Sequence, residues 1–128
     1  LVIDKNLTLP KHLSLFDGST RTLVFTQCEN TPNLFQVEFI QLDFNRDILT
    51  QIFEVLYQEK LQSLMVEGGS ILLQSFIDAG YWDEAYIEHS SDYLKDGIKA
   101  PKLTGEYDFL TEQHFGRNIG YAIRKALR

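Results

Sequence analysis

The sequence predicts an α/β fold with a mostly parallel central sheet, flanking helices and a carboxyl-terminal antiparallel hairpin. Residues 1–3 and 22–26 are short apolar runs rich in β-branched residues, which is typical of buried strands. Apolar residues recur at helical spacing from Asp47 to about Leu61 and again from Ile71 to Ala79. Strands that alternate with helices in this way favour a parallel sheet covered by those helices.

The first half of the chain is predicted to form three strands and then the first of these helices. The strand at 1–3 is followed by Pro10 and a turn signal at 17–19, which mark an irregular connection to the strand at 22–26. A third strand is expected within 34–42, where apolar residues recur along an extended run.

The second half begins with a compact apolar strand, Ser63–Val66, which leads directly into Gly68, Gly69 and the second helix. Gly80 is the expected left-handed residue just past the end of that helix. A further strand is expected at 85–87.

The last part of the chain is predicted to close the sheet. The turn-rich segment 93–104 is expected to be a surface loop, and 109–115 and 119–123 are expected to form an antiparallel hairpin. An alternative interpretation makes 121–125 a short helix.

Length and charge limit the possible functions. The chain has 128 residues, so we expect one domain spanning 1–128. Twelve Lys and Arg against 18 Asp and Glu give a net charge of -6. This charge argues against nucleic acid or an anionic membrane as a partner, because both require a basic face. Any phosphate chemistry must therefore be local.

The chain has a single cysteine, Cys28, so it can form neither an internal disulfide nor a cysteine-based metal cluster. We therefore expect a reducing, cytoplasmic location, and we find no apolar run of about 20 residues that could span a membrane. The sequence opens at Leu1 inside a predicted strand, so we expect it to be a piece of a longer protein.

The segment from Val66 to Ser70 is the one place where the local sequence indicates a ligand. Gly68 and Gly69 carry no side chains that would keep a phosphate or a nicotinamide away from the backbone. The helix that follows offers unpaired amides to an anion, and ligands of α/β sheets lie at this end of the strands. The alternative is a plain tight turn in which Ser70 caps the helix.

Glu67 is an acid at the last position of a predicted buried strand, where it is awkward for packing alone. Its carboxylate could accept hydrogen bonds from substrate hydroxyl or amine groups, or stabilise a cation in the transition state. The alternative is an ordinary solvated loop acid.

Two stretches of the sequence together resemble a known family. One comprises Leu64–Leu73, Ser75–Gly80 and Asp83-Glu84, and the other comprises Val2–Asp4, Asn6-Leu7, Leu9-Pro10, Leu15–Gly18 and Thr22–Thr26. They resemble the bacterial riboflavin-biosynthesis reductase domain, which is the carboxyl-terminal half of the bifunctional pyrimidine deaminase/reductase. The resemblance covers Leu1 to about Ser90.

The resemblance implies a dihydrofolate-reductase-like fold and an NADPH-dependent reduction. The implied substrate is a phosphoribosylaminopyrimidine, 5-amino-6-(5-phosphoribosylamino)uracil, whose ribosyl group becomes a ribityl chain. It implies that Glu67 faces the substrate and that Lys5 could meet the 2'-phosphate of NADPH, although a lysine after a strand is often simply solvated. The cofactor contacts that it implies on the glycine-to-helix segment are Gly69, Ser70, Ile71, Leu72, Leu73, Gln74 and Ser75. No side chain is expected to be an obligatory catalytic proton donor.

The sequence also departs from this family. We expect the upstream part of the reductase domain and the whole zinc deaminase domain to be absent. His12, His89 and His114 lie in no His-x-Glu pattern, so neither a metal site nor deaminase activity is expected. Two alternatives remain: a non-catalytic remnant that acts only in assembly, and another reductase on the same fold, such as one acting on a pterin. A homodimer is expected in either case, through an uncovered strand edge at 1–3 or 22–26.

Overall fold

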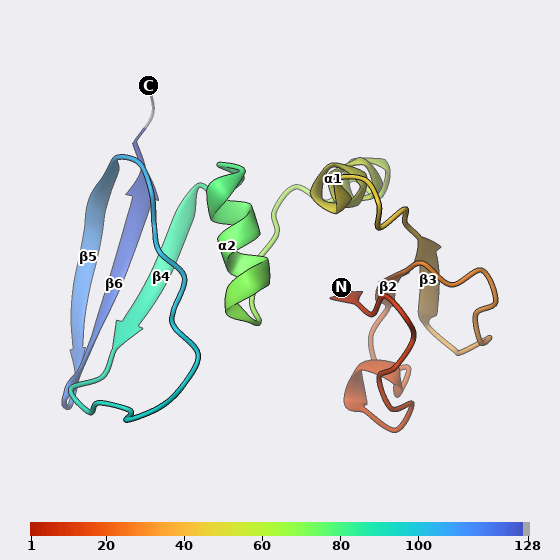
Figure 1. The fold of residues 1–128 in the computed structure, drawn as a ribbon, viewed down its shortest axis with the longest axis horizontal. Coiled ribbons are helices and arrows are strands. Elements are labelled where there is room, and N and C mark those ends of the chain that lie inside the picture. The colour runs from red at the N-terminus through yellow and green to blue at the C-terminus, as the bar shows by residue number, and fades with distance from the viewer. Residues whose placement is uncertain (127–128) are drawn as a thin grey trace. The chain divides into compact units, whose positions relative to one another are not determined.

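A computed structural model describes residues 1–126 (Figure 1). The chain divides into two compact units, an amino-terminal unit over Leu1–Leu64 and a carboxyl-terminal unit from Met65 onward. Each unit contains one sheet and one α-helix. No helix among the described residues is both long enough and apolar enough to cross a bilayer.

The sheet of the amino-terminal unit is parallel, as predicted. Its strands are β1 (Val2–Ile3), β2 (Thr22–Thr26) and β3 (Val37–Gln41), in the order β1-β2-β3. Val24 of β2 lies opposite Val2 on one side and Phe39 on the other. Because β2 is paired along both edges, the predicted dimer edge at 22–26 is wrong, whereas β1 is an edge strand.

The first helix, α1 (Ile48–Gln58), is confirmed but shorter than predicted. It starts where the Asp47 carboxylate accepts a hydrogen bond from the Leu49 amide at 3.1 Å. It ends early because Lys60 adopts a left-handed φ of 57° and the Leu61 amide donates to the Leu56 carbonyl. The helix contributes to a core formed by Phe25, Leu42, Ile52 and Leu56.

Asp4 ends β1 and is buried, with only 4% of its surface exposed. Its carboxylate accepts hydrogen bonds from the Thr8 amide at 2.8 Å, the Thr8 hydroxyl at 3.2 Å and the Leu9 amide at 3.0 Å. Burial alone raises the pKa of Asp4, but the bonds from Leu9 and Thr8 outweigh it, so the pKa lies below its usual value. The ionised carboxylate therefore holds the loop after β1.

The substitution Asp4→Asn should destabilise the protein at pH 7 by about 1–3 kcal/mol, because an amide can no longer accept all three bonds. A carboxyl with a lowered pKa stabilises the fold above its unfolded pKa of about 3.9, and that contribution is lost as the pH falls through the folded pKa. The difference between wild type and variant should therefore shrink below about pH 4, as measured by urea denaturation at several pH values. An equal difference at pH 7 and pH 3 would contradict the role of the charge.

The sheet of the carboxyl-terminal unit is antiparallel. Gly80 follows its helix with a φ of 71°, as the sequence predicts. The loop 93–104 is exposed over most of its length. The elements are α2 (Ser70–Asp78), β4 (Glu84–His89), β5 (Tyr107–Phe115) and β6 (Asn118–Lys125), and the strand order is β4-β6-β5.

The predicted hairpin is confirmed as β5 and β6, and the alternative helix at 121–125 is wrong. The register of this pair shifts between Phe109 and Thr111. The shift is a bulge, which leaves one residue of β5 unpaired and turns the following side chains to the other face.

The strand predicted at Ser63–Val66 is not formed. This segment has no regular secondary structure, and no described strand pairs with it. An apolar composition favours a strand only where a neighbouring strand supplies hydrogen bonds, and here that neighbour is lacking. Val66 and the residues after it therefore lead into α2 as an irregular segment that pairs with no described strand.

Candidate functional site

The predicted ligand site at 66–70, the glycine corner, forms the approach to α2. Gly68 has a φ of 129°, which only glycine adopts readily, whereas Gly69 has an ordinary extended conformation with a φ of −68° and ψ of 154°. Gly69 is the N-cap and Ser70 is the first residue of the helix, so Ser70 does not cap the helix as the tight-turn alternative expected. The N-cap has no side chain to satisfy the first amides of α2, which remain able to bind an anion.

The corner is open. A Cβ atom built on Gly69 would meet nothing within 4 Å, and one built on Gly68 would meet only Leu72, at 4.0 Å. Glu67 is exposed, and it makes no hydrogen bond or ion pair with the rest of residues 1–126. The structure therefore leaves the Glu67 carboxylate able to accept hydrogen bonds from a ligand at this corner.

The predicted contact residues of α2 differ in how available they are. Ile71 is 87% exposed, whereas Leu72 and Leu73 are half-buried. The Gln74 amide is occupied, because it accepts from the Lys102 amide at 2.8 Å and donates to the Lys102 carbonyl at 3.1 Å. The Ser75 hydroxyl donates to the Leu72 carbonyl within the helix at 2.7 Å. Among these residues the first turn of α2 is thus the most accessible to a ligand.

The pairing of Gln74 with Lys102 was not predicted from the sequence. It joins the middle of α2 to the long loop before β5, and Gln74 also donates to Asp78 at 2.7 Å. The sequence offered no signal for it, since the two residues are 28 positions apart. Gln74 therefore has a structural role in addition to the ligand role that the resemblance implies.

Lys5 belongs to the amino-terminal unit and lies at the carboxyl end of β1. Its ammonium lies 5.4 Å from the centroid of the Phe44 ring. Phe44 lines a cavity of about 690 Å³ at the carboxyl ends of β2 and β3. The residues that line this cavity are Gln27, Cys28, Gln41, Leu42, Asp43, Phe44 and Asn45. This end of a parallel sheet is where α/β folds place ligands, but the sequence drew attention only to Lys5.

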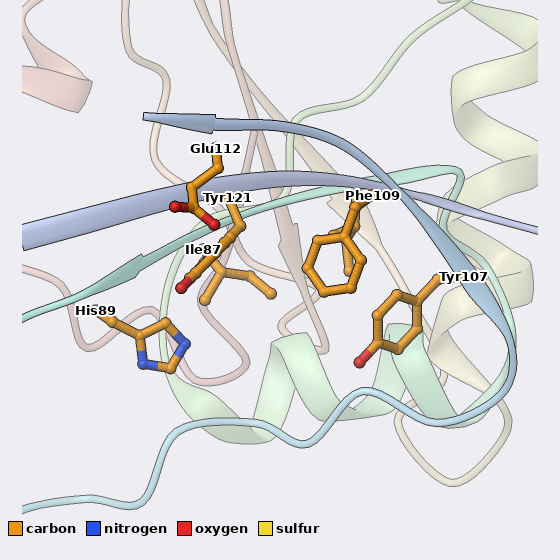
Figure 2. Close-up of a pocket in the computed structure, with 7 residues that line it drawn as sticks. Ile87, His89, Tyr107, Phe109, Glu112 and Tyr121 are labelled. Atoms are coloured by element: carbon orange, nitrogen blue, oxygen red, sulfur yellow. The ribbon is translucent and has the colours of Figure 1, made fainter. Parts of the chain in front are cut away.

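A second cavity, of about 570 Å³, lies on one face of the antiparallel sheet (Figure 2). Its lining comes from all three strands and consists of Ile87, His89, Tyr107, Phe109, Glu112, Tyr121 and Ile123. The Tyr121 ring meets those of His89 and Phe109 edge-on, with centroids 5.7 and 6.0 Å apart, which stabilises the face.

Glu112 reaches this aromatic face only because of the bulge in β5. Phe109 lies opposite Ile123, and Glu112 lies opposite Tyr121, although strict alternation from Phe109 would bring Thr111 to the same face. The Glu112 carboxylate lies 2.9 Å from Nε2 of His114. The sequence predicted the strand, but it contained no signal for the bulge that turns Glu112 toward the aromatic face.

Comparison with known proteins gives a consistent family match. Residues 1–114 match the family described as the RibD C-terminal domain. The chain is also 26% identical over 110 residues to the riboflavin biosynthesis protein RibD of Bacillus amyloliquefaciens, a match that covers 80% of this chain and 29% of that protein. The chain therefore spans less than a third of the curated relative.

Solved structures show the same fold. A diaminohydroxyphosphoribosylaminopyrimidine deaminase/5-amino-6-(5-phosphoribosylamino)uracil reductase of Thermotoga maritima has a TM-score of 0.78 at 20% identity, over 98% of this chain and 37% of that one. A pyrimidine reductase-like protein of Corynebacterium diphtheriae has a TM-score of 0.75 at 17% identity, over 98% and 60%. A Saccharomyces riboflavin biosynthesis reductase has a TM-score of 0.69 at 17% identity, over 98% and 68%.

These structures confirm the predicted α/β class, with a parallel sheet followed by an antiparallel carboxyl-terminal sheet as in dihydrofolate-reductase-like reductase domains. The sequence match covers the amino-terminal unit and most of the carboxyl-terminal unit. Since residues 1–114 match the family and the fold agrees with it, the chain belongs to the RibD C-terminal domain family, the reductase-domain family of riboflavin biosynthesis.

Proposed function

We propose that the chain is the carboxyl-terminal portion of an NADPH-dependent reductase that acts on the ribosyl group of 5-amino-6-(5-phosphoribosylamino)uracil. The observation that carries this proposal is the open corner at Gly68 and Gly69, with the unpaired Glu67 carboxylate beside it, in a chain of this family. The space around Gly69 leaves the backbone approachable.

The residues at the corner fit a dinucleotide. Gly69 permits close approach of a flat ring or a phosphate, and the first amides of α2, from Ser70 onward, would donate to an anionic group. Bound NADPH would supply a hydride to the sugar carbon. Glu67 would accept hydrogen bonds from the hydroxyl or amine groups of the substrate and so orient it. Lys5 would contribute positive charge to the 2'-phosphate of the cofactor.

The two units would together form a single reductase domain in a cytoplasmic enzyme, and the enzyme would be a homodimer. The free edge of β1 supports the expectation of a dimer, because it leaves backbone groups unpaired by any described strand.

Titration of the chain with NADPH, followed by the fluorescence of the nicotinamide, should show saturable binding with a dissociation constant below about 1 mM, the upper end of ordinary KM values. Binding is the primary measurement because the chain spans only part of its relatives and turnover could require more of the protein. Where turnover occurs, the phosphoribosylaminopyrimidine should oxidise NADPH faster than a dihydropterin does. Absence of saturable binding would favour the non-catalytic alternative, and a preference for the pterin would favour another reductase of this fold.

A further inference from the structure

The cavity of about 570 Å³ on the antiparallel sheet takes no part in the proposed reduction. Its lining residues all belong to β4, β5 and β6, so it lies wholly within the carboxyl-terminal unit. Its volume falls in the range of small-molecule sites, about 300–1,000 Å³. The chemistry of its walls therefore decides what it can bind.

The walls are mainly aromatic rings. The Phe109 ring meets the rings of Tyr107 and Tyr121 with centroids 5.8 and 6.0 Å apart and with interplanar angles of 69° and 72°. Rings at these angles turn their faces in different directions around the cavity, and all three side chains project from the same side of the sheet (Figure 2). Phe109 is 68% exposed, so its ring is accessible to a ligand. Because the face of an aromatic ring carries partial negative charge, such walls attract a cation.

The charged groups of the lining favour the same sign of ligand. Glu112 is the one carboxylate among the described residues that line the cavity, and the only basic side chain among them is the imidazole of His89. Oε1 of Glu112 lies 2.9 Å from Nε2 of His114, whereas Oε2 has no hydrogen-bond partner within residues 1–126. A neutral or anionic ligand that covered this carboxylate would leave its charge uncompensated. The rings and the free carboxylate oxygen therefore both favour a cation.

A second copy of the chain is the competing occupant of this surface. A twofold contact would bring the surface against itself, so each Glu112 would meet a patch that also carries Glu112 and has no lysine or arginine in its described lining. Burying carboxylates without a cationic partner is unfavourable. A small cation would cover the same surface without that penalty.

We propose that this cavity, walled by the rings of Tyr107, Phe109 and Tyr121 and by the Glu112 carboxylate, binds a small organic cation with an alkylated ammonium group. The ring faces hold the cation, and Glu112 supplies the opposite charge. The hydroxyls of Tyr107 and Tyr121 have no hydrogen-bond partner within residues 1–126, so they can bond to a polar group of the same molecule. The site is separate from the glycine corner and does not depend on the binding of NADPH.

The test uses choline and its uncharged carbon isostere, 3,3-dimethylbutan-1-ol, titrated into the full chain without NADPH and followed by NMR of the aromatic ring protons. The two probes share their shape and their hydroxyl, so the difference in affinity measures the effect of the positive charge. Choline should bind saturably and about 10-fold more tightly than the isostere, the gain expected when a cation contacts two ring faces.

Two substitutions in the lining separate the contributions. Phe109→Leu keeps an apolar side chain but removes a ring face, and Glu112→Gln keeps the shape but removes the charge. Each should reduce the advantage of choline over the isostere by about threefold or more. Phe115→Leu and Asp108→Asn are the matched controls, because both residues are exposed on β5 and do not line the cavity. Both controls should leave the advantage unchanged.

Absence of saturable choline binding up to about 10 mM, or equal affinities for the two probes, would overturn the proposal. A wild type that sediments as a dimer and is dissociated by Phe109→Leu would also overturn it, since the surface would then be an interface between copies. Thermal melts check that the variants fold, which is expected because Phe109 and Glu112 are both exposed. If Phe109→Leu does not fold, the comparison of Glu112→Gln with Asp108→Asn decides.

Discussion

Replacing Gly69 with valine should raise the dissociation constant for NADPH by about 100-fold or more while the protein stays folded. The extended backbone of Gly69 suits a β-branched residue, and the space that a Cβ would enter is empty, so the side chain fits the protein itself. The same side chain would occupy the volume through which the cofactor must approach the backbone. Fluorescence titration gives the affinity, and a thermal melt should show a cost of at most about 1 kcal/mol.

The matched variant is Gly68→Ala, one residue earlier. Its Cβ would also find room, since the nearest atom is 4.0 Å away, but the φ of 129° at Gly68 disfavours any side chain. This variant should therefore lose stability because alanine is strained at this positive φ. If Gly69→Val bound NADPH as tightly as the wild type, the corner would not be where the dinucleotide meets the chain.

Glu67→Gln should lower kcat/KM for the phosphoribosylaminopyrimidine by about 10- to 100-fold, the loss expected for one charge-assisted hydrogen bond in the transition state. NADPH affinity should be unchanged, because Glu67 is proposed to face the substrate. Stability should also be unchanged, since the carboxylate is exposed and has no hydrogen-bond or ion-pair partner within residues 1–126.

Glu54→Gln supplies the control for this charge change. Glu54 is an exposed acid on α1, so the substitution alters the net charge by the same amount in the amino-terminal unit. Steady-state kinetics should separate the two variants. Equal effects at both positions would mean that Glu67 acts only through the overall charge of the chain.

The elements that were predicted correctly are those that local sequence specifies. The apolar run at 22–26 forms the central strand β2, and the periodic apolar residues from Asp47 onward form α1. Gly80 ends α2 with a positive φ, as its sequence position indicates. In each case the side-chain pattern within a few residues selects one conformation.

One incorrect prediction concerned a strand whose formation depends on a partner strand. Ser63–Val66 has the composition of a strand, but it pairs with no described strand and remains irregular. Composition measures how well a segment would fit a sheet, and the free energy of the strand comes from cross-strand contacts. The identity of that partner is not encoded in the four residues themselves.

Some features of the candidate site were likewise predictable from local sequence, and others were not. The sequence by itself determined the two α-helices, most of the strands and the place of the glycine corner beside Glu67, because backbone freedom and periodic apolar patterns are local properties. Only the tertiary structure decided that the corner is open, that a bulge turns Glu112 to the aromatic face, and that the Asp4 carboxylate and the Thr26 hydroxyl bond to the loop after β1. These features depend on contacts between residues distant in sequence, so the physical cause lies in packing and hydrogen-bond geometry that local propensity does not specify.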